Sequence, residues 1–294
     1  MNTNNTPLLT SVCTDMLYIN LQLNDIERLE VIKNLHQLCN EYGIKSFVKY
    51  GYSNAVQLLK EEQDKTIIFC IDPKYPDRSF VHLQLNPSAL DKTLAKSLKA
   101  DLVYLLGDKY VDLYHNSSVT RLDIAADFIN LKVDDFNLLS SKQRRSSSFY
   151  NQKGETETVY LGHKKSNLSI KIYDKTAQCQ AKRKYCDASK QITRIEASIN
   201  PHCAWKDITK IENPFEGLRI YKLSDLITEE QLPISFCDSL QLRGLTATLR
   251  LLKPDEKKFV KSILDRYVYH DLPAKEIFEQ WKLSLRKLSP LKAK

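Results

Sequence analysis

Apolar and polar positions in the first third of the chain switch repeatedly between the period of a strand and that of a helix. Runs of apolar, β-branched and aromatic residues favour pleated, half-buried positions. They predict strands at 16–23, 44–50, 66–71 and 80–85. Helical spacing of apolar residues begins at Asn24 or Asp25 and reaches Tyr42, where Gly43 is a typical stop.

The middle of the chain continues the mixture. A second helix is predicted from the turn at 86–88 to residue 106. The polar, basic stretch 142–154 indicates a mobile surface loop, and the lysine-rich segment 177–190 indicates a helix. Period-two runs predict further strands at 119–130, 158–161, 168–175 and 192–199.

After Pro214 the pattern is mainly helical, with amphipathic segments at 255–269 and 274–288. The whole pattern predicts an α+β fold, in which helices back an antiparallel β-sheet and a helical C-terminal region follows. We therefore expect an α+β domain at 1–212 and a mainly helical region at 213–294.

Three of the predicted strands carry a polar face opposite an apolar one, because successive side chains of a strand point to opposite sides. In 119–130, the polar set contains Arg121, Asp123 and Asp127. Two carboxylates on one strand face imply that water or a cation meets them. The apolar set of the same strand is Leu122, Ile124, Ala126 and Phe128.

The other two strands divide in the same way. In 168–175, Tyr173 shares a face with Lys171 and Lys175, so two ammonium groups flank a tyrosine hydroxyl. In 192–199, Arg194 and Glu196 share the polar face. If the three strands belong to one sheet, these groups converge into a set that suits metal-assisted phosphodiester chemistry. Periodicity alone leaves that convergence open.

Five short motifs, in order between residues 80 and 200, resemble those of the Rep_trans family of plasmid rolling-circle replication initiators. The run Thr120–Phe128 is similar to its TRLD-x-A-x-DF motif. The others are similar to its F-N-P-x-x-L turn, its G-x-x-E-T-x-Y-x-G segment, its S-N-x-x-I-R-I-Y-N-K segment and its R-V-E strand: 85–90, 154–162, 166–175 and 194–196.

The resemblance implies a replication-initiator nuclease-like fold and an enzyme that nicks one strand at a plasmid or phage-like origin. Tyr173 falls on the family's nucleophilic tyrosine, and Lys171 and Lys175 flank it. A metal-assisted transesterification would give a 5′-phosphotyrosyl intermediate and a 3′-OH primer. Asp123 and Glu196 fall on acidic positions that imply metal ligands.

The implied metal is Mg²⁺ or Mn²⁺, because hard divalent ions prefer carboxylate oxygens. Asp127 is the weakest of three candidate ligands, since four residues of strand separate it from Asp123 by about 13 Å. Two departures from the family pattern matter. Gln178 stands where the family often has a glutamate, and Lys171 replaces an arginine, which keeps the charge without the bidentate geometry.

The net charge of the chain adds one candidate partner, a phosphate polymer such as DNA, to this interpretation. A formal net charge of +8 fits a protein that contacts phosphate polymers, although it also fits an ordinary surface. The region 213–294 is expected either to bind DNA or to complete the core. The candidate DNA-binding residues are Arg121, Arg144, Arg145, Lys164, Lys165, Lys182, Arg183, Lys184 and Arg194.

Seven cysteines without a CxxC pair indicate reduced thiols rather than a zinc site. The chain has no run of apolar residues that approaches the length of a membrane helix, and its N-terminus is unlike a signal peptide. We expect a cytoplasmic protein that binds origin duplex and single-stranded DNA and no membrane. A host helicase and a second copy of the chain are further candidate partners.

Three alternatives stay open. A conjugative relaxase of the same fold would use identical chemistry, and only genetic context would separate the two. A catalytically inactive DNA-binding regulator fits the loss of a glutamate at Gln178 but not the retention of Asp123, Tyr173 and Glu196. An RNA-binding sheet domain is disfavoured, because the sequence gives no sign of exposed aromatic pairs on neighbouring strands.

Overall fold

A computed structural model of the chain describes residues 7–59, 67–140, 146–163, 166–181, 191–228, 232–266 and 270–292. Its α-helices are α1 (Asp25–Tyr42), α2 (Lys92–Leu106), α3 (Tyr110–His115), α4 (Lys175–Ala181), α5 (Leu223–Thr228), α6 (Ile234–Arg243), α7 (Leu245–Arg250), α8 (Pro254–Arg266) and α9 (Ala274–Ser284). Its 3₁₀ helices are η1 (Pro87–Ala89), η2 (Gly107–Lys109), η3 (Val133–Asp135), η4 (Trp205–Lys210) and η5 (Leu285–Leu291).

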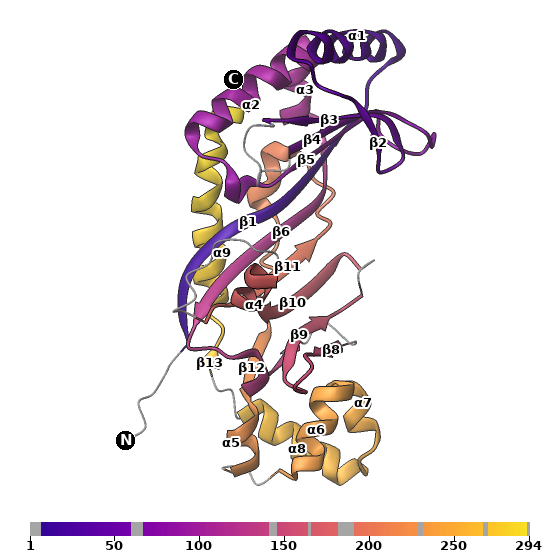
Figure 1. Cartoon of the computed structure of the whole chain (residues 1–294). Coiled ribbons are helices and arrows are strands. Elements are labelled where there is room, and N and C mark those ends of the chain that lie inside the picture. The colour runs from indigo at the N-terminus through magenta and orange to yellow at the C-terminus, as the bar shows by residue number, and fades with distance from the viewer. Residues whose placement is uncertain are drawn as a thin grey trace. The chain divides into compact units, whose positions relative to one another are not determined.

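The strands are β1 (Leu8–Leu21), β2 (Phe47–Lys49), β3 (Tyr52–Leu58), β4 (Ile67–Pro73), β5 (Val81–Leu85), β6 (Ser118–Ile129), β7 (Phe136–Ser140), β8 (Ser146–Tyr150), β9 (Thr156–Leu161), β10 (Leu168–Asp174), β11 (Thr193–Ile199), β12 (Leu218–Lys222) and β13 (His270–Asp271). Ten of them form one antiparallel sheet in the order β2-β3-β4-β5-β1-β6-β11-β10-β9-β8 (Figure 1). The other three form a small sheet in the order β13-β12-β7. The predicted α+β class is therefore confirmed.

Two compact units make up the chain, and both are discontinuous in sequence. The first unit comprises residues 1–12, 125–199 and 213–279, and the second comprises 13–124, 200–212 and 280–294. Strands β1 and β6 contribute residues to both units. One of the boundaries between the two units falls between residues 212 and 213.

The second unit contains the sheet order β2-β3-β4-β5 together with the second part of β1 and the first part of β6. Helix α1 begins where the sequence predicts, because Asn24 and Glu27 form a reciprocal capping box. It ends at Gly43, whose φ of 61° places it in the left-handed region that glycine adopts without strain. Its buried residues are Val31, Leu35 and Leu38.

The last residues of the chain belong to the core of the second unit. Trp281 is 0% exposed, and its indole Nε1 donates a hydrogen bond to Thr14 Oγ1 at 3.0 Å. Leu288 and Leu291 in η5 are also buried. The Tyr110 hydroxyl donates to the main-chain oxygen of Leu291. Residues 281–291 therefore complete the core of the second unit.

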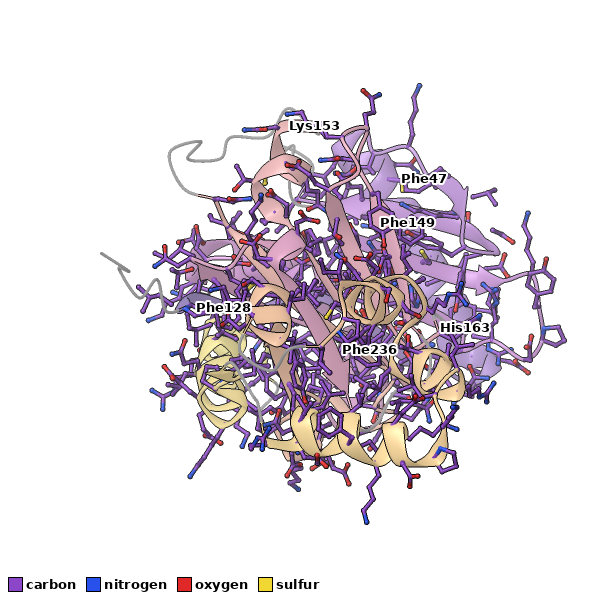
Figure 2. The ribbon with its side chains drawn as sticks, turned by 90° about the horizontal axis from the view of Figure 1, so that it is seen from below. Phe47, Phe128, Phe149, Lys153, His163 and Phe236 are labelled. Carbon is purple, nitrogen blue, oxygen red and sulfur yellow. The ribbon has the colours of Figure 1, made fainter. Side chains whose placement is uncertain are left out.

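In the first unit, β11-β10-β9-β8 form the outer strands of the sheet, and helices α5 to α8 follow (Figure 1). The helices have their own apolar cluster, which includes Phe236 of α6 (Figure 2). Its other buried members are Tyr221, Leu226, Leu232, Cys237, Leu240, Leu249, Val260, Ile263 and Leu264. The predicted helical C-terminal region is therefore confirmed, with β12 and β13 as additions.

Three elements differ from the sequence-based expectation. The predicted loop at 142–154 contains strand β8 between 146 and 150, so the loop assignment is wrong for those residues. Strands β3 and β7 were not predicted.

In the described part of the chain, no helix is long and apolar enough to cross a membrane. The six cysteines within that part are free thiols.

Candidate active site

The polar faces of β10 and β11 lie side by side in the first unit. Their antiparallel register sets Lys171 opposite Glu196 and Tyr173 opposite Arg194. Directly opposed residues of an antiparallel pair project to the same face. The register therefore places these four side chains on one face, a convergence that periodicity alone leaves open.

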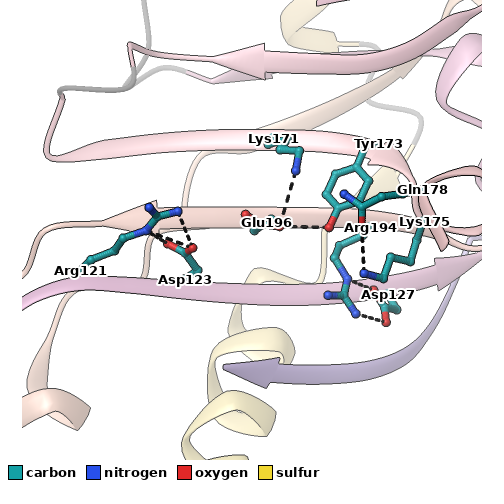
Figure 3. Close-up of polar contacts among 9 residues, drawn as sticks. All are labelled: Arg121, Asp123, Asp127, Lys171, Tyr173, Lys175, Gln178, Arg194 and Glu196. Carbon is teal, nitrogen blue, oxygen red and sulfur yellow. Dashed lines mark hydrogen bonds and ion pairs between the residues drawn. The ribbon is translucent and has the colours of Figure 1, made fainter. Parts of the chain in front are cut away.

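Tyr173 is the centre of this face. Its side chain is only 3% exposed, and its hydroxyl donates a hydrogen bond to Glu196 Oε2 at 3.1 Å (Figure 3). The Lys171 ammonium lies 3.7 Å from the centroid of the tyrosine ring and 3.9 Å from Glu196 Oε2. The phenol is thus held between a carboxylate, which can accept its proton, and a cation, which favours the phenolate.

Lys175 and Gln178 form a second contact beside the tyrosine. Lys175 begins α4, and its Nζ lies 5.9 Å from the centroid of the Tyr173 ring. The same ammonium donates a hydrogen bond to Gln178 Oε1 at 3.0 Å. The residue that departs from the family pattern therefore positions one of the two predicted lysines.

Arg194 and Asp127 form a nearly buried ion pair. Arg194 Nε lies 2.6 Å from Asp127 Oδ1, and Nη2 lies 2.8 Å from Oδ2, so the contact is bidentate (Figure 3). Ser11 Oγ also donates to Oδ2 at 3.1 Å. Arg194 is predicted to bind DNA and Asp127 to be a weak candidate for the metal, but here each neutralises the other.

Asp123 belongs to the second unit and has a partner on its own strand. Arg121 Nε and Nη2 donate to its carboxylate at 2.8–3.1 Å. Asp123 is 3% exposed, whereas the Arg121 side chain is 42% exposed and its guanidinium lies 5.3 Å from the centroid of the Tyr18 ring. Arg121, another predicted DNA-binding residue, thus neutralises a buried carboxylate through its head group.

The donor set fits a metal ion only in part. Among the described residues, no group of three or more His, Cys, Asp and Glu side chains is assembled to hold one. Mg²⁺ needs fewer protein ligands, because one or two carboxylates suffice when water and substrate phosphate oxygens complete its shell. Glu196 is a carboxylate of the kind that this requirement calls for. Asp127 and Asp123 do not meet it, because Arg194 binds both oxygens of Asp127 and Arg121 binds both oxygens of Asp123.

The three predicted basic clusters do not belong to the described part of the chain. Arg144, Arg145, Lys164, Lys165, Lys182, Arg183 and Lys184 lie outside the described residues. Their roles remain predictions from sequence.

One feature of this face was missed at the level of sequence. Phe149 on β8 and Tyr160 on β9 have ring centroids 5.6 Å apart and an interplanar angle of 78°. Phe149 is exposed and Tyr160 is half-buried, and the sequence alone gives no sign of this pair. The two residues are 11 positions apart, so only the register of β8 against β9 brings them together. Burial, followed by the charge of Glu196, raises the pKa of Tyr160.

Part of the chain is similar in sequence to known replication initiation proteins. No family model matches the chain. A replication initiation protein of Staphylococcus aureus is 29% identical over 126 residues, which cover 42% of this chain and 36% of that protein. Another from the same organism is 26% identical over 158 residues, covering 53% of this chain and 46% of the relative. The predicted resemblance to replication initiators is confirmed by these matches.

The chain matches less than half the length of these curated relatives. Among solved structures, a rolling circle replication initiator protein from Geobacillus stearothermophilus is 18% identical. That match covers 80% of this chain and 98% of the other, with a TM-score of 0.43.

Proposed function

We propose that this protein is a rolling-circle replication initiator that nicks one strand of an origin with Tyr173. The observation that carries the proposal is the contact between the Tyr173 hydroxyl and Glu196 Oε2, with the Lys171 ammonium over the ring. It lies in a chain similar in sequence to replication initiation proteins.

The proposed reaction is a transesterification in which bonds and protons balance. A tyrosine with an ordinary pKa near 10 is mostly protonated at neutral pH and is a weak nucleophile. Glu196 accepts the phenolic proton as the Tyr173 oxygen attacks the scissile phosphorus. The bond between phosphorus and the 3′ oxygen breaks, and that oxygen takes a proton from water to become the 3′-OH primer. The 5′ phosphate stays esterified to the tyrosine.

Two lysines support this attack by different contacts. The Lys171 ammonium favours the phenolate and a phosphate that approaches it, because both are negative. Lys175 is held by Gln178 at a greater distance from the ring and meets the phosphate rather than the phenol. Because Tyr173 is almost fully buried, DNA binding has to shift side chains around the hydroxyl, and flexible Lys171 suits that movement.

A divalent ion is part of the proposal, and Glu196 would be its carboxylate ligand in the first unit. When bound, Mg²⁺ or Mn²⁺ would neutralise charge that develops on the phosphate oxygens. Because the phosphotyrosyl ester conserves the energy of the broken bond, a 3′-OH can later reseal the strand. Cleavage and rejoining then need no external energy source.

Incubation with supercoiled plasmid that carries the cognate origin tests the proposal. The wild-type chain should yield a covalent protein–DNA band on a denaturing gel. Tyr173→Phe should remove that band while DNA binding persists, because only the hydroxyl is lost. Tyr42→Phe, at a 70% exposed position on α1, is the matched control and should keep the band. An adduct formed by Tyr173→Phe would refute the assignment. DNA binding without any adduct in the wild-type chain would favour an inactive regulator.

A further inference from the structure

The face that holds Tyr173 continues across β9 to the edge strand β8. The register sets Phe149 opposite Thr158, and Thr158 opposite Tyr173. In the neighbouring row, Tyr160 is opposite Lys171. Because directly paired residues project to one side, both aromatic rings lie on the face of the proposed nucleophile. Two strand spacings separate Phe149 from Tyr173, which is roughly 10 Å.

Strand β8 has one covered face and one open face. Ser148 is half-buried, and its Oγ donates to the main-chain oxygen of Gln241 on α6 at 3.0 Å. Ser147 and Phe149, which alternate with Ser148, are exposed. Helix α6 therefore covers the side of β8 that faces away from Tyr173.

Phe149 is the unexpected residue on the open side, because its large apolar ring is 56% exposed at a sheet edge (Figure 2). An exposed aromatic on an edge strand is a hazard for aggregation, and soluble proteins usually place polar residues there. The ring of Tyr160 packs edge-to-face with it, which limits how the phenylalanine can turn. Phe149 therefore presents an aromatic ring of restricted orientation on the same face as Tyr173, the proposed DNA-cleaving residue.

We propose that Phe149, supported by Tyr160, stacks a base of the single DNA strand whose phosphate enters the Tyr173 site. This inference rests on the proposed function and adds a binding subsite to it. Stacking on an aromatic ring is tolerant of sequence, because every base has a π-face. A base stacked on Phe149 would fix the position of the DNA strand. The scissile phosphate would then lie next to the Tyr173 hydroxyl.

Charge in the sequence around the pair fits a nucleic-acid strand as the occupant. Arg144 and Arg145 immediately precede β8, and Lys164 and Lys165 follow β9 shortly after its end. Lys171 lies opposite Tyr160 in the register of the sheet. Cations that bind phosphates, interleaved with aromatics that stack bases, are the combination used for single-stranded nucleic acid.

Binding of a short mixed-sequence DNA oligonucleotide to the full chain tests the proposal, with Tyr173→Phe as the parent so that no cleavage occurs. Adding Phe149→Ala should weaken binding by about tenfold, the loss typical of one base stack. Phe149→Trp should bind at least as tightly as the parent. Phe259→Ala, which removes a 61% exposed phenylalanine on α8, is the matched control and should change nothing.

An oligonucleotide with the same backbone but abasic sites gives the second measurement. It should bind weakly and equally to the parent and to the Phe149→Ala variant, because stacking requires a base. The proposal is overturned if Phe149→Ala binds the normal oligonucleotide as tightly as the parent, or if an RNA of the same sequence binds more tightly than the DNA.

Different experimental results would contradict the proposed stacking subsite and the proposed function. If only the subsite is wrong, the wild-type chain still forms the covalent adduct and Phe149→Ala binds normally. If the proposed function is wrong, the wild-type chain forms no adduct with origin DNA. Loss of all single-strand binding by the parent would overturn both.

Discussion

At the scale of single residues, the contact between Glu196 and the Tyr173 hydroxyl gives the most direct prediction. Glu196→Gln keeps the size of the side chain but removes its ability to take a proton. We expect the rate of adduct formation to fall by about 100- to 10,000-fold, the usual contribution of a positioned acid or base. Single-turnover assays with a saturating origin oligonucleotide measure this rate without interference from product release.

The pH profile separates proton transfer from a purely structural effect of the same substitution. The wild-type chain and Glu196→Gln should differ in the shape of the profile of rate against pH, because only the wild-type side chain can accept the proton. Glu216→Gln removes an exposed carboxylate of the first unit and should leave rate and profile unchanged. A Glu196→Gln variant that nicks at the wild-type rate would exclude the carboxylate as proton acceptor.

His82 gives a pH prediction for the second unit. Burial, with a smaller effect of the Arg78 charge, lowers the pKa of His82 to about 4. The unfolded value is near 6.5, so the stability contributed by the neutral ring is fully present above pH 6.5 and lost as pH falls toward 4. We expect a loss of about 3 kcal/mol across that window, measured by urea unfolding.

The surroundings of His82 allow a matched control. Its Nδ1 lies 2.7 Å from Asn20 Oδ1, and its ring contacts those of Tyr18, Tyr50 and Tyr52. His82→Gln keeps a polar group near Asn20 but cannot titrate, so its stability should be flat between pH 6.5 and 4. An equally steep loss in that variant would assign the pH dependence to other groups.

At the scale of elements, local chemistry decided what the sequence could predict. The ends of helix α1 were predicted to within about a residue, because Asn24 or Asp25 and Gly43 mark them within the chain itself. Strand β8 was missed because Ser146, Ser147 and Ser148 have little preference for strands. It forms because it pairs with β9 across the short connection 151–155, and the serine run itself gives no sign of that pairing.

The candidate site shows the same limit. Alternation was enough to group Tyr173 with Lys171 along β10, and Glu196 with Arg194 along β11, because that depends only on the period of a strand. Only the register of β10 against β11 places the two groups on one face. Alternation could not reveal that Asp127 binds Arg194 or that Asp123 binds Arg121. Choosing partners among several carboxylates and cations requires the register between strands and the rotamers of long side chains.

The ion pair between Asp127 on β6 and Arg194 on β11 should stabilise the first unit. Its side chains are 13% and 9% exposed, so removing one partner leaves a poorly solvated charge. We expect Asp127→Ala to lower the free energy of unfolding by about 3 kcal/mol. Replacing both partners, by Asp127→Leu with Arg194→Met, should recover most of that loss. Chemical denaturation followed by circular dichroism measures both, and an unchanged midpoint for Asp127→Ala would contradict this role.

At the scale of the whole molecule, the C-terminal region has two separate structural roles. Residues 213–279 belong to the first unit, whereas residues 280–294 belong to the second. Truncation before Trp281 would remove a fully buried indole and its bond to Thr14, and so would damage the second unit. Point substitutions on exposed positions are therefore the sound way to look for DNA contacts in this region.

Salt dependence tests how the whole charge distribution meets DNA. With 44 basic and 36 acidic residues, the chain has a formal net charge of +8. Each phosphate that a Lys or Arg neutralises releases counterions and contributes about −0.9 to the slope of log K against log salt for duplex DNA. Replacing Lys182, Arg183 and Lys184 by alanine should therefore make that slope shallower by about one unit for each phosphate that the variant no longer neutralises.

This triple substitution should weaken binding to origin and unrelated duplexes alike, because phosphates are the same in every sequence. It should leave cleavage of a saturating single-stranded oligonucleotide nearly intact, since Tyr173, Glu196 and Lys171 are untouched. The control carries the same loss of charge on exposed lysines of the second unit, with Lys45, Lys92 and Lys96 replaced by alanine. An equal change of slope in both triple variants would mean that overall charge, rather than the basic cluster at 182–184, holds the duplex.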